Sequence, residues 1–116
     1  MKLKEIVKEL NLKVITAKDS LDKEVIGGYA SDLLSDVIAN SKDSNIWVTL
    51  QIHQNIVAVA SMKNLSGIIL VNAREPEKDT VEKAEQENIA IMASNLPAFE
   101  VIGRLYALGI CGKKQC

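Results

Sequence analysis

The sequence predicts a three-layer α/β/α domain with a mainly parallel, mixed sheet of about five strands. Two observations support this fold class. Segments with helical periodicity alternate with short segments rich in β-branched residues along most of the chain. In addition, residues 67–71 (GIILV) begin with a glycine and continue as an uninterrupted apolar run. Such a run is typical of a parallel strand that is buried on both faces.

The first quarter of the chain is expected to contain one helix and two strands. Apolar residues at helical spacing favour a short helix over 2–10, and residues 14–15 suggest a brief strand. A polar loop covers 17–23. Residues 24–28 (EVIGG) then form a strand that runs into two glycines, which indicate a tight turn or a close backbone approach.

The middle of the chain is expected to alternate helix and strand. Ser31 or Asp32 can cap the next helix. The apolar face of that helix consists of Leu33, Leu34, Val37 and Ile38. Residues 46–50 are typical of a strand. Residues 53–62 have the β-branched content of a strand, but parallel neighbours need a crossover of about a dozen residues, so we expect a helix there.

Another helix and strand follow residues 67–71. Pro76 suits the first turn of a helix that continues through 80–87, with Val81 and Ala84 facing inward. Residues 89–93 (IAIMA) are the next expected strand.

The last helix is expected over 96–108. Gly103 in its middle suggests close packing, and Gly109 suits a C-terminal cap. The inward side chains are expected to be Phe99, Ile102, Leu105 and Tyr106. We expect one domain over 1–116, in which 1–23 supply the N-terminal helix and strand and 111–116 form a flexible tail.

Charge and composition exclude several classes of partner. The net charge is −1, and the basic residues are scattered and include only two arginines, so nucleic acid is not an expected partner. No apolar run approaches the roughly 18 residues of a membrane span, and the N-terminus lacks the apolar core of a signal peptide. We therefore expect a cytoplasmic protein whose Cys111 and Cys116 are reduced thiols, rather than a redox-sensitive pair.

Polar residues gather after the expected strands. Ligands of open α/β sheets bind beyond the carboxyl ends of the strands, near helix N-termini that favour anions. The expected ligand-binding residues are Gly27, Gly28, Ser31, Gln51, His53, Asn55, Asn72, Arg74 and Ser94. The alternative is that these residues simply cap helices and fill loops.

The sequence offers little for catalysis. His53, the only histidine, could act as a general base, but no acidic residue lies near it in the sequence and its nucleophilic partner is undefined. The histidine and cysteine pattern does not match a metal site, so we expect no metal and no cofactor. Residues 109–114 (GICGKK) resemble a phosphate-binding loop only superficially, because they follow a helix.

Four segments together resemble DRTGG domains, especially small stand-alone members from anaerobic bacteria and archaea. These segments are IGGYASDLLSDVIAN, IWVTLQIHQNIVAVASM, GIILVNAREP and LPAFEVIGRLYALGI, and they cover about residues 24–110. The resemblance implies a fold like the N-terminal domain of HPr kinase/phosphorylase. It also implies a role in regulation and assembly, sometimes with adenine nucleotides, as for DRTGG domains beside CBS domains in regulated pyrophosphatases.

The sequence departs from the letters that give the family its name. The Asp-Arg pair would fall near 52–53 and the Thr-Gly-Gly near 71–73, and neither is retained. Glu75, Pro76 and Phe99 do fit the family pattern. Loss of the arginine removes a cation from the expected ligand edge, where Arg74 is the local substitute. The kinase's catalytic P-loop domain has no counterpart in these residues, so kinase activity is not carried over.

Three hypotheses follow from the sequence. The favoured one is a non-catalytic regulatory module that senses an adenine nucleotide or another small anion. The alternative is a homodimeric interaction protein, accessory to a redox system of the hydrogenase type because stand-alone family members are often encoded near such genes. This alternative uses the apolar helix over 56–62 as a contact surface. The least favoured is a small enzyme with His53 as general base.

Overall fold

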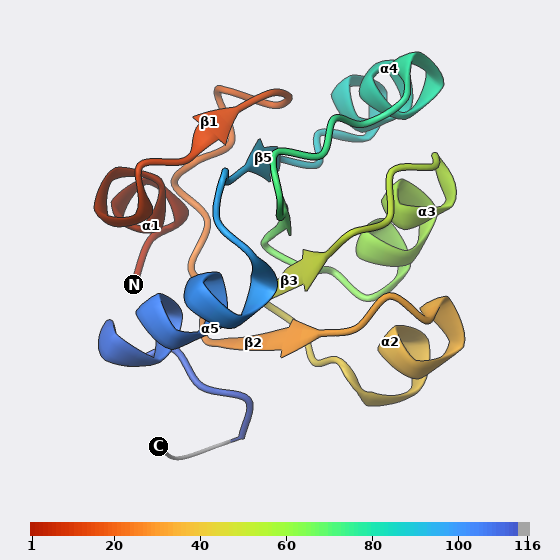
Figure 1. Ribbon diagram of the computed structural model, residues 1–116. Helices are drawn as coiled ribbons and strands as arrows, with labels where there is room; N and C mark the ends of the chain where they lie inside the picture. Colours follow the sequence, from red (N-terminus) through yellow and green to blue (C-terminus); the bar gives the residue numbers. More distant parts are fainter. Residues whose placement is uncertain (114–116) are drawn as a thin grey trace.

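The computed structural model describes residues 1–113 and contains a five-stranded sheet in the order β1-β5-β4-β3-β2 (Figure 1). The strands are β1 (Lys13–Val14), β2 (Gly27–Ala30), β3 (Asn45–Thr49), β4 (Gly67–Leu70) and β5 (Ile91–Ala93). The helices are α1 (Leu3–Leu10), α2 (Leu34–Asn40), α3 (Asn55–Met62), α4 (Lys78–Glu87) and α5 (Ala98–Ala107). Strands β2 to β5 are parallel and β1 pairs antiparallel with β5, so the predicted mainly parallel, mixed sheet is confirmed.

The helices form two layers, one on each face of the sheet (Figure 1). Helices α2, α3 and α4 connect successive parallel strands and cover one face, whereas α1 and α5 cover the other. The expectation of a helix rather than a strand around 53–62 is correct. Among residues 1–113, no helix combines the length and the apolar character that crossing a membrane requires.

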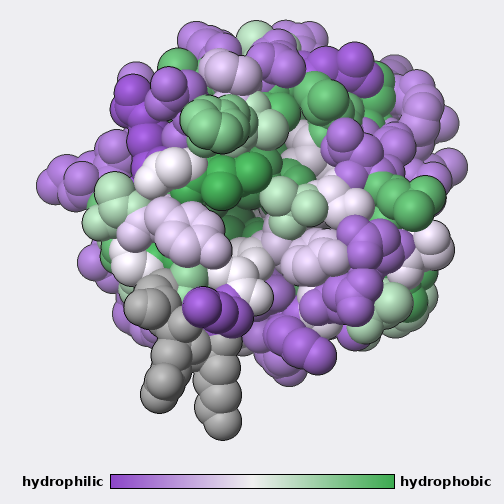
Figure 2. Space-filling model, turned by 60° about the horizontal axis from the view of Figure 1, so that its bottom comes forward, coloured by the Kyte–Doolittle hydropathy of each residue, from purple (hydrophilic) through white to green (hydrophobic). Residues whose placement is uncertain are grey.

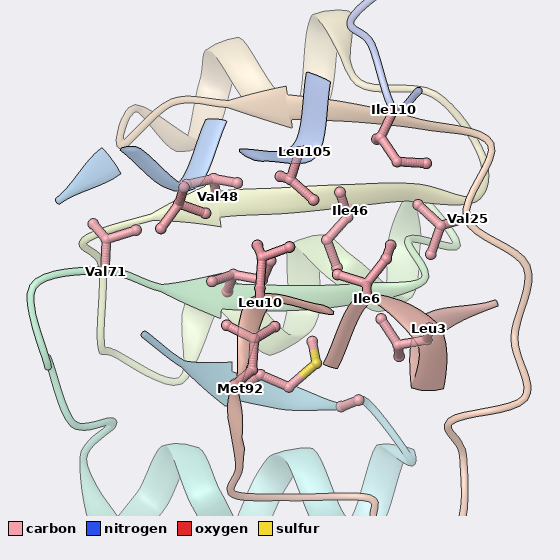
Figure 3. Packing of buried hydrophobic residues seen from close by; sticks show 14 of the residues in the cluster. Leu3, Ile6, Leu10, Val25, Ile46, Val48, Val71, Met92, Leu105 and Ile110 are labelled. Carbon is pink, nitrogen blue, oxygen red and sulfur yellow. The ribbon is translucent and has the colours of Figure 1, made fainter. Parts of the chain in front are cut away.

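Two cores lie on opposite faces of the central strands. Side chains alternate along β3, so that Ile46 and Val48 pack towards α1 and α5 while Trp47 packs towards α2 and α3. Figure 3 shows Leu3 and Ile6 of α1 converging on this first core. Ile56, Val57, Val59 and Ala60 of α3 belong to the second core, so most of the apolar contact surface expected over 56–62 is buried and only Ala58 and Met62 are exposed.

Strand β2 begins later than predicted. The expected strand over 24–28 is wrong, because pairing with β3 starts at Gly27 and continues to Ala30. The close backbone approach is correct: a Cβ added at Gly27 would lie 3.0 Å from the carbonyl oxygen of Cys111. Gly27 and Gly28 therefore lie at the amino end of β2, in register with the first residues of β3.

Helix α5 is rotated relative to the prediction. Phe99 is 89% exposed and Tyr106 is 54% exposed, whereas Val101 and Leu105 are buried. The pattern was ambiguous because apolar residues occur on both sides of this helix, and the sheet contacts the side that carries 101 and 105. The close packing expected at Gly103 is also wrong, since a Cβ there would have no neighbouring atom within 4 Å.

Two further differences concern helix starts. Pro76 precedes α4 instead of occupying its first turn, because Glu77 is the N-cap. In the segment leading into α2, Val37 is buried as expected, but Leu33 is 65% exposed because it lies before the helix begins.

Cys111 packs against β2. Its carbonyl oxygen accepts a hydrogen bond from the backbone N–H of Gly28 (3.0 Å), and the residue is buried. It is also disulfide-bonded. The expectation of a reduced thiol is therefore wrong at Cys111, because it rested on an assumed reducing compartment, and the flexible tail expected over 111–116 stays a prediction. Cys116 lies outside the described residues.

The loop after β4 contains two adjacent residues in the left-handed region, Asn72 (φ 57°) and Ala73 (φ 56°). This conformation is common for asparagine but costs alanine roughly 1–2 kcal/mol, because its Cβ approaches the backbone. The loop lies at the carboxyl end of β4, so it forms part of the edge on which the sequence places a ligand.

Thr16 joins β1 to β5 inside the protein, and its removal is expected to destabilise the fold. The Thr16 hydroxyl donates to the Ile89 carbonyl oxygen (2.7 Å) and accepts from the Ile91 N–H (2.8 Å). Thr16→Val leaves both backbone groups without this partner, so we expect the free energy of unfolding to fall by about 1–3 kcal/mol in urea titrations. Thr80→Val is the matched control. Thr80→Val removes one hydrogen bond to the Ile52 carbonyl oxygen, but that oxygen still accepts from the N–H of Glu77. The free energy of unfolding should therefore fall less in Thr80→Val than in Thr16→Val. Equal losses in the two variants would contradict this account.

Ala73→Gly is expected to stabilise the protein. Glycine adopts a left-handed conformation without the Cβ clash, and this gain exceeds the larger entropy that glycine adds to the unfolded chain. We expect the free energy of unfolding to rise by roughly 1 kcal/mol. Ala58→Gly, in the exposed part of α3, serves as the control and should lower it by about 0.5–1 kcal/mol. A loss of stability in Ala73→Gly would argue against strain in this loop.

Candidate functional site

The carboxyl ends of the four parallel strands lie along one edge of the sheet. Because these strands are adjacent, four of the predicted site residues follow neighbouring strands: Ser31 after β2, Gln51 after β3, Asn72 after β4 and Ser94 after β5. The structure therefore gathers this part of the predicted site at one edge. We call it the carboxyl edge.

Asp32 organises the carboxyl edge between β2 and β3. Its Oδ1 atom accepts hydrogen bonds from the Thr49 hydroxyl (2.7 Å) and the Leu50 N–H (2.7 Å). Its carbonyl oxygen accepts from Nε2 of Gln51 (2.9 Å). Asp32 was expected only as a helix cap, yet α2 begins without a side-chain cap. Sequence reasoning missed these contacts because they join residues 17 to 19 positions apart.

Ser31 connects the same loop to the core. Its carbonyl oxygen accepts a hydrogen bond from the indole N–H of Trp47 (2.9 Å), and its hydroxyl oxygen accepts from the N–H of Leu33 (3.1 Å). The only tryptophan of the chain is thus buried directly beneath a predicted site residue. This contact makes Trp47 a natural fluorescent reporter for changes at the carboxyl edge.

The loop after β4 donates backbone hydrogen bonds to the loop after β5. The N–H of Asn72 donates to the carbonyl oxygen of Leu96 (2.9 Å), and the N–H of Ala73 donates to that of Ser94 (2.8 Å). The hydroxyl oxygen of Ser94 accepts from the N–H of Leu96 (3.1 Å). These amides therefore hold the loops together and do not form a ready-made anion cradle.

His53 has an acidic partner that the sequence concealed. Its Nδ1 atom lies 2.9 Å from Oε1 of Glu77, which is 24 positions away, and both side chains are about half exposed. A carboxylate on Nδ1 is the orienting part of a nucleophilic active site. However, no hydroxyl or thiol within residues 1–113 hydrogen-bonds to His53, so the arrangement lacks a nucleophile.

The remaining predicted site residues are scattered. Asn55 is the exposed first residue of α3, and Arg74 is exposed and forms no ion pair with other side chains of residues 1–113. Gly27 and Gly28 lie at the opposite end of β2 from the carboxyl edge, where Gly28 lines a hollow beside α5. No cluster of three or more histidine, cysteine or acidic side chains suited to a metal occurs among the described residues.

Two adjoining hollows open over β2 and β3, each of about 210 Å³. The edge hollow lies at the carboxyl edge and is lined by Ser31, Asp32, Thr49, Leu50, Val71 and Ala98. The tyrosine hollow lies between β2, α5 and residues 110–112, and its walls include Tyr29, Ile102, Leu105, Tyr106 and Ile110. Ala30 and Val48 line both. Figure 2 looks onto this side of the molecule and shows a green, hydrophobic hollow in the middle of the face.

Tyr29 lines the tyrosine hollow, but its side chain packs against the second core, where an acidic residue of α2 holds it. Its hydroxyl donates to Oδ1 of Asp36 (2.7 Å). This bond, with further bonds from Ser31 and Asn40, holds the pKa of the Asp36 carboxyl below its usual range. The same bond to Asp36 raises the pKa of Tyr29. Sequence reasoning placed Tyr29 among the polar groups after a strand, but neither Tyr29 nor Asp36 among the expected ligand-binding residues, because the strand was expected to end at residue 28.

The Tyr29–Asp36 bond predicts a pH-dependent contribution to stability. A carboxyl whose pKa is lowered on folding stabilises the folded state above its unfolded pKa, and this contribution is lost as the pH falls through the folded pKa. The melting temperature of Tyr29→Phe should therefore lie below that of the wild type at about pH 6, and the gap should close as the pH falls below the ordinary pKa of an aspartate, about 3.9. Tyr106→Phe is the control, because the hydroxyl of Tyr106 bonds to the N–H of Gly112 and to no carboxylate. The difference in melting temperature between this variant and the wild type should not change with pH in the acid range. A constant gap for Tyr29→Phe would contradict the assignment.

Comparison with known proteins identifies the fold. No family model matches the sequence, and no curated protein matches it. Among solved structures, the chain is similar to the CBS and DRTGG domains of the regulatory region of Clostridium perfringens pyrophosphatase, complexed with its activator diadenosine tetraphosphate. The TM-score is 0.64 and the identity is 15%, and the match covers 85% of this chain and 43% of that chain. Likeness at this identity establishes the fold alone, and the chain therefore has the DRTGG-like fold that its sequence resemblance predicts.

Proposed function

We propose that the chain is a non-catalytic regulatory module that senses a small ligand, with adenine nucleotides as its ligand class. The observation that carries this proposal is the pair of adjoining hollows, which joins apolar walls and the ring of Tyr106 to a carboxylate at the carboxyl edge. Ligand sites combine these features, a mostly apolar cleft with a few placed polar groups. The likeness to a regulatory region complexed with a nucleotide activator supports the same function.

The chemistry of the hollows suits the nucleoside part of such a ligand. A purine ring can lie against the apolar walls of the tyrosine hollow, where Tyr106 offers an aromatic face. Asp32 uses only Oδ1 within the described residues, so Oδ2 can accept hydrogen bonds from ribose hydroxyls or an amino group. A phosphate would be repelled by Asp32 and would need the exposed Arg74 instead.

Catalysis is not part of the proposal. His53 and Glu77 could position a proton, but hydrolysis or transfer also needs a nucleophile or an activated water. Neither hollow includes His53 among its lining residues. Association with a redox system of the hydrogenase type stays a prediction from the sequence resemblance.

Ligand binding is expected to stabilise the protein and to change the fluorescence of Trp47. Adenosine, AMP, ATP, diadenosine tetraphosphate and inorganic phosphate form the test panel, because they separate base recognition from phosphate recognition. A ligand at a hundred times its Kd adds about 2.7 kcal/mol to the free energy of unfolding. Trp47 should respond because its indole contacts Ser31, which lines the edge hollow.

Three variants assign the binding to the hollows. Ala30→Leu places a larger side chain where both hollows meet, so it should abolish the stabilisation, whereas Ala58→Leu on exposed α3 should leave it unchanged. Arg74→Ala should weaken the binding of phosphorylated ligands and leave the binding of adenosine unchanged. Failure of every compound to shift the melting temperature, or binding that survives Ala30→Leu, would overturn the proposed function.

A further inference from the structure

Helix α5 presents an apolar stripe to solvent. The stripe consists of Phe99, Ile102, Gly103 and Tyr106, which recur at the three- and four-residue spacing of one helix face. Phe99 is 89% exposed, and a Cβ at Gly103 would have no neighbouring atom within 4 Å. The opposite side of α5 already fills the core through Val101 and Leu105. Ile102 is half-buried against the first core, and the other residues of the α5 stripe are not required by the fold of one chain.

The α5 stripe is complementary to itself when two copies run antiparallel. A twofold axis between residues 102 and 103 brings together residues at equal distances on either side of that midpoint. Phe99 then lies opposite Tyr106 of the partner subunit, which gives two aromatic pairs across the axis. Ile102 lies opposite the partner's Gly103, whose missing side chain leaves room for it.

The charges beside the α5 stripe favour the same arrangement. Glu100 and Arg104 lie about 100° and about 140° around the helix from Phe99, both beyond the Gly103 side of the stripe, since successive residues are rotated by about 100°. Neither forms an ion pair or a side-chain hydrogen bond within residues 1–113. In the antiparallel pair, Glu100 meets Arg104 of the partner subunit on the shared flank, and the symmetry repeats the contact. A parallel pair would place like charges opposite each other instead.

We propose that the chain forms a twofold-symmetric homodimer in which the α5 stripes of two copies pack antiparallel. The register is set by the Glu100–Arg104 pairs and by the fit of Ile102 over Gly103. A ten-residue helix is about 15 Å long, so the helix pair alone buries less than the roughly 800 Å² per subunit of a standard stable interface. The dimer is therefore a reversible one with a Kd in the micromolar range, and its assembly depends on concentration.

Sedimentation velocity over a concentration series from about 1 μM to about 1 mM tests the dimer directly. The wild-type mass should rise from that of a monomer to that of a dimer. Phe99→Glu should raise the Kd at least about tenfold, because it places a carboxylate in the apolar contact, and its circular dichroism should stay unchanged since Phe99 is exposed. Met62→Glu alters another exposed apolar residue, on α3, and should leave the Kd unchanged.

A charge-swap experiment tests the antiparallel register. Glu100→Arg and Arg104→Glu each place like charges across the twofold axis, so each variant alone should stay monomeric. An equimolar mixture of the two should form a heterodimer, because every Arg then meets a Glu. Failure of the mixture to dimerise would overturn the register. A wild-type mass that stays monomeric up to about 1 mM, or loss of the dimer in Met62→Glu rather than in Phe99→Glu, would overturn the interface.

Discussion

The structure depends on the burial of both faces of the central strands. Every residue of β3 and β4 is buried, so both faces of the sheet must be covered. Three crossover helices cover one face, because each parallel strand is connected to the next through a helix. The other face has no crossover and is covered by α1 and α5, which come from the two ends of the described chain (Figure 1). That second layer has only two helices, which is why hollows open beside α5.

The sequence predicted the elements well because local periodicity determines them. The predictions failed where a residue distant in the sequence determines the position or the contacts of a segment. Residues 24–28 look like a strand, but pairing with β3 places the strand at Gly27–Ala30. In α5, apolar residues on two sides of the helix allowed two orientations, and contact with the sheet selected the one that exposes Phe99. The partners of Asp32 and His53 lie 17 and 24 positions away, so no local pattern could show that they are neighbours.

The loop after β4 explains a departure from the DRTGG letters. The resemblance aligns the two glycines of the motif with Asn72 and Ala73, and both residues adopt the left-handed conformation that glycine favours. The backbone shape that the glycines serve is therefore present although the glycines are absent. Its N–H groups bond to the carbonyls of Ser94 and Leu96, which fixes the connection into α5. In this chain the loop therefore helps to hold the start of α5 in place.

The proposed ligand site and the proposed dimer share side chains. Ile102 and Tyr106 line the tyrosine hollow and also belong to the α5 stripe. A purine against Tyr106 would fix a ring that the dimer also uses, so binding and assembly are thermodynamically linked. Linkage is reciprocal: a ligand that binds the dimer tenfold more tightly than the monomer strengthens dimerisation by the same factor for each bound site. Under the two proposals, this small fold converts ligand concentration into a change of assembly, since both events act on one helix face.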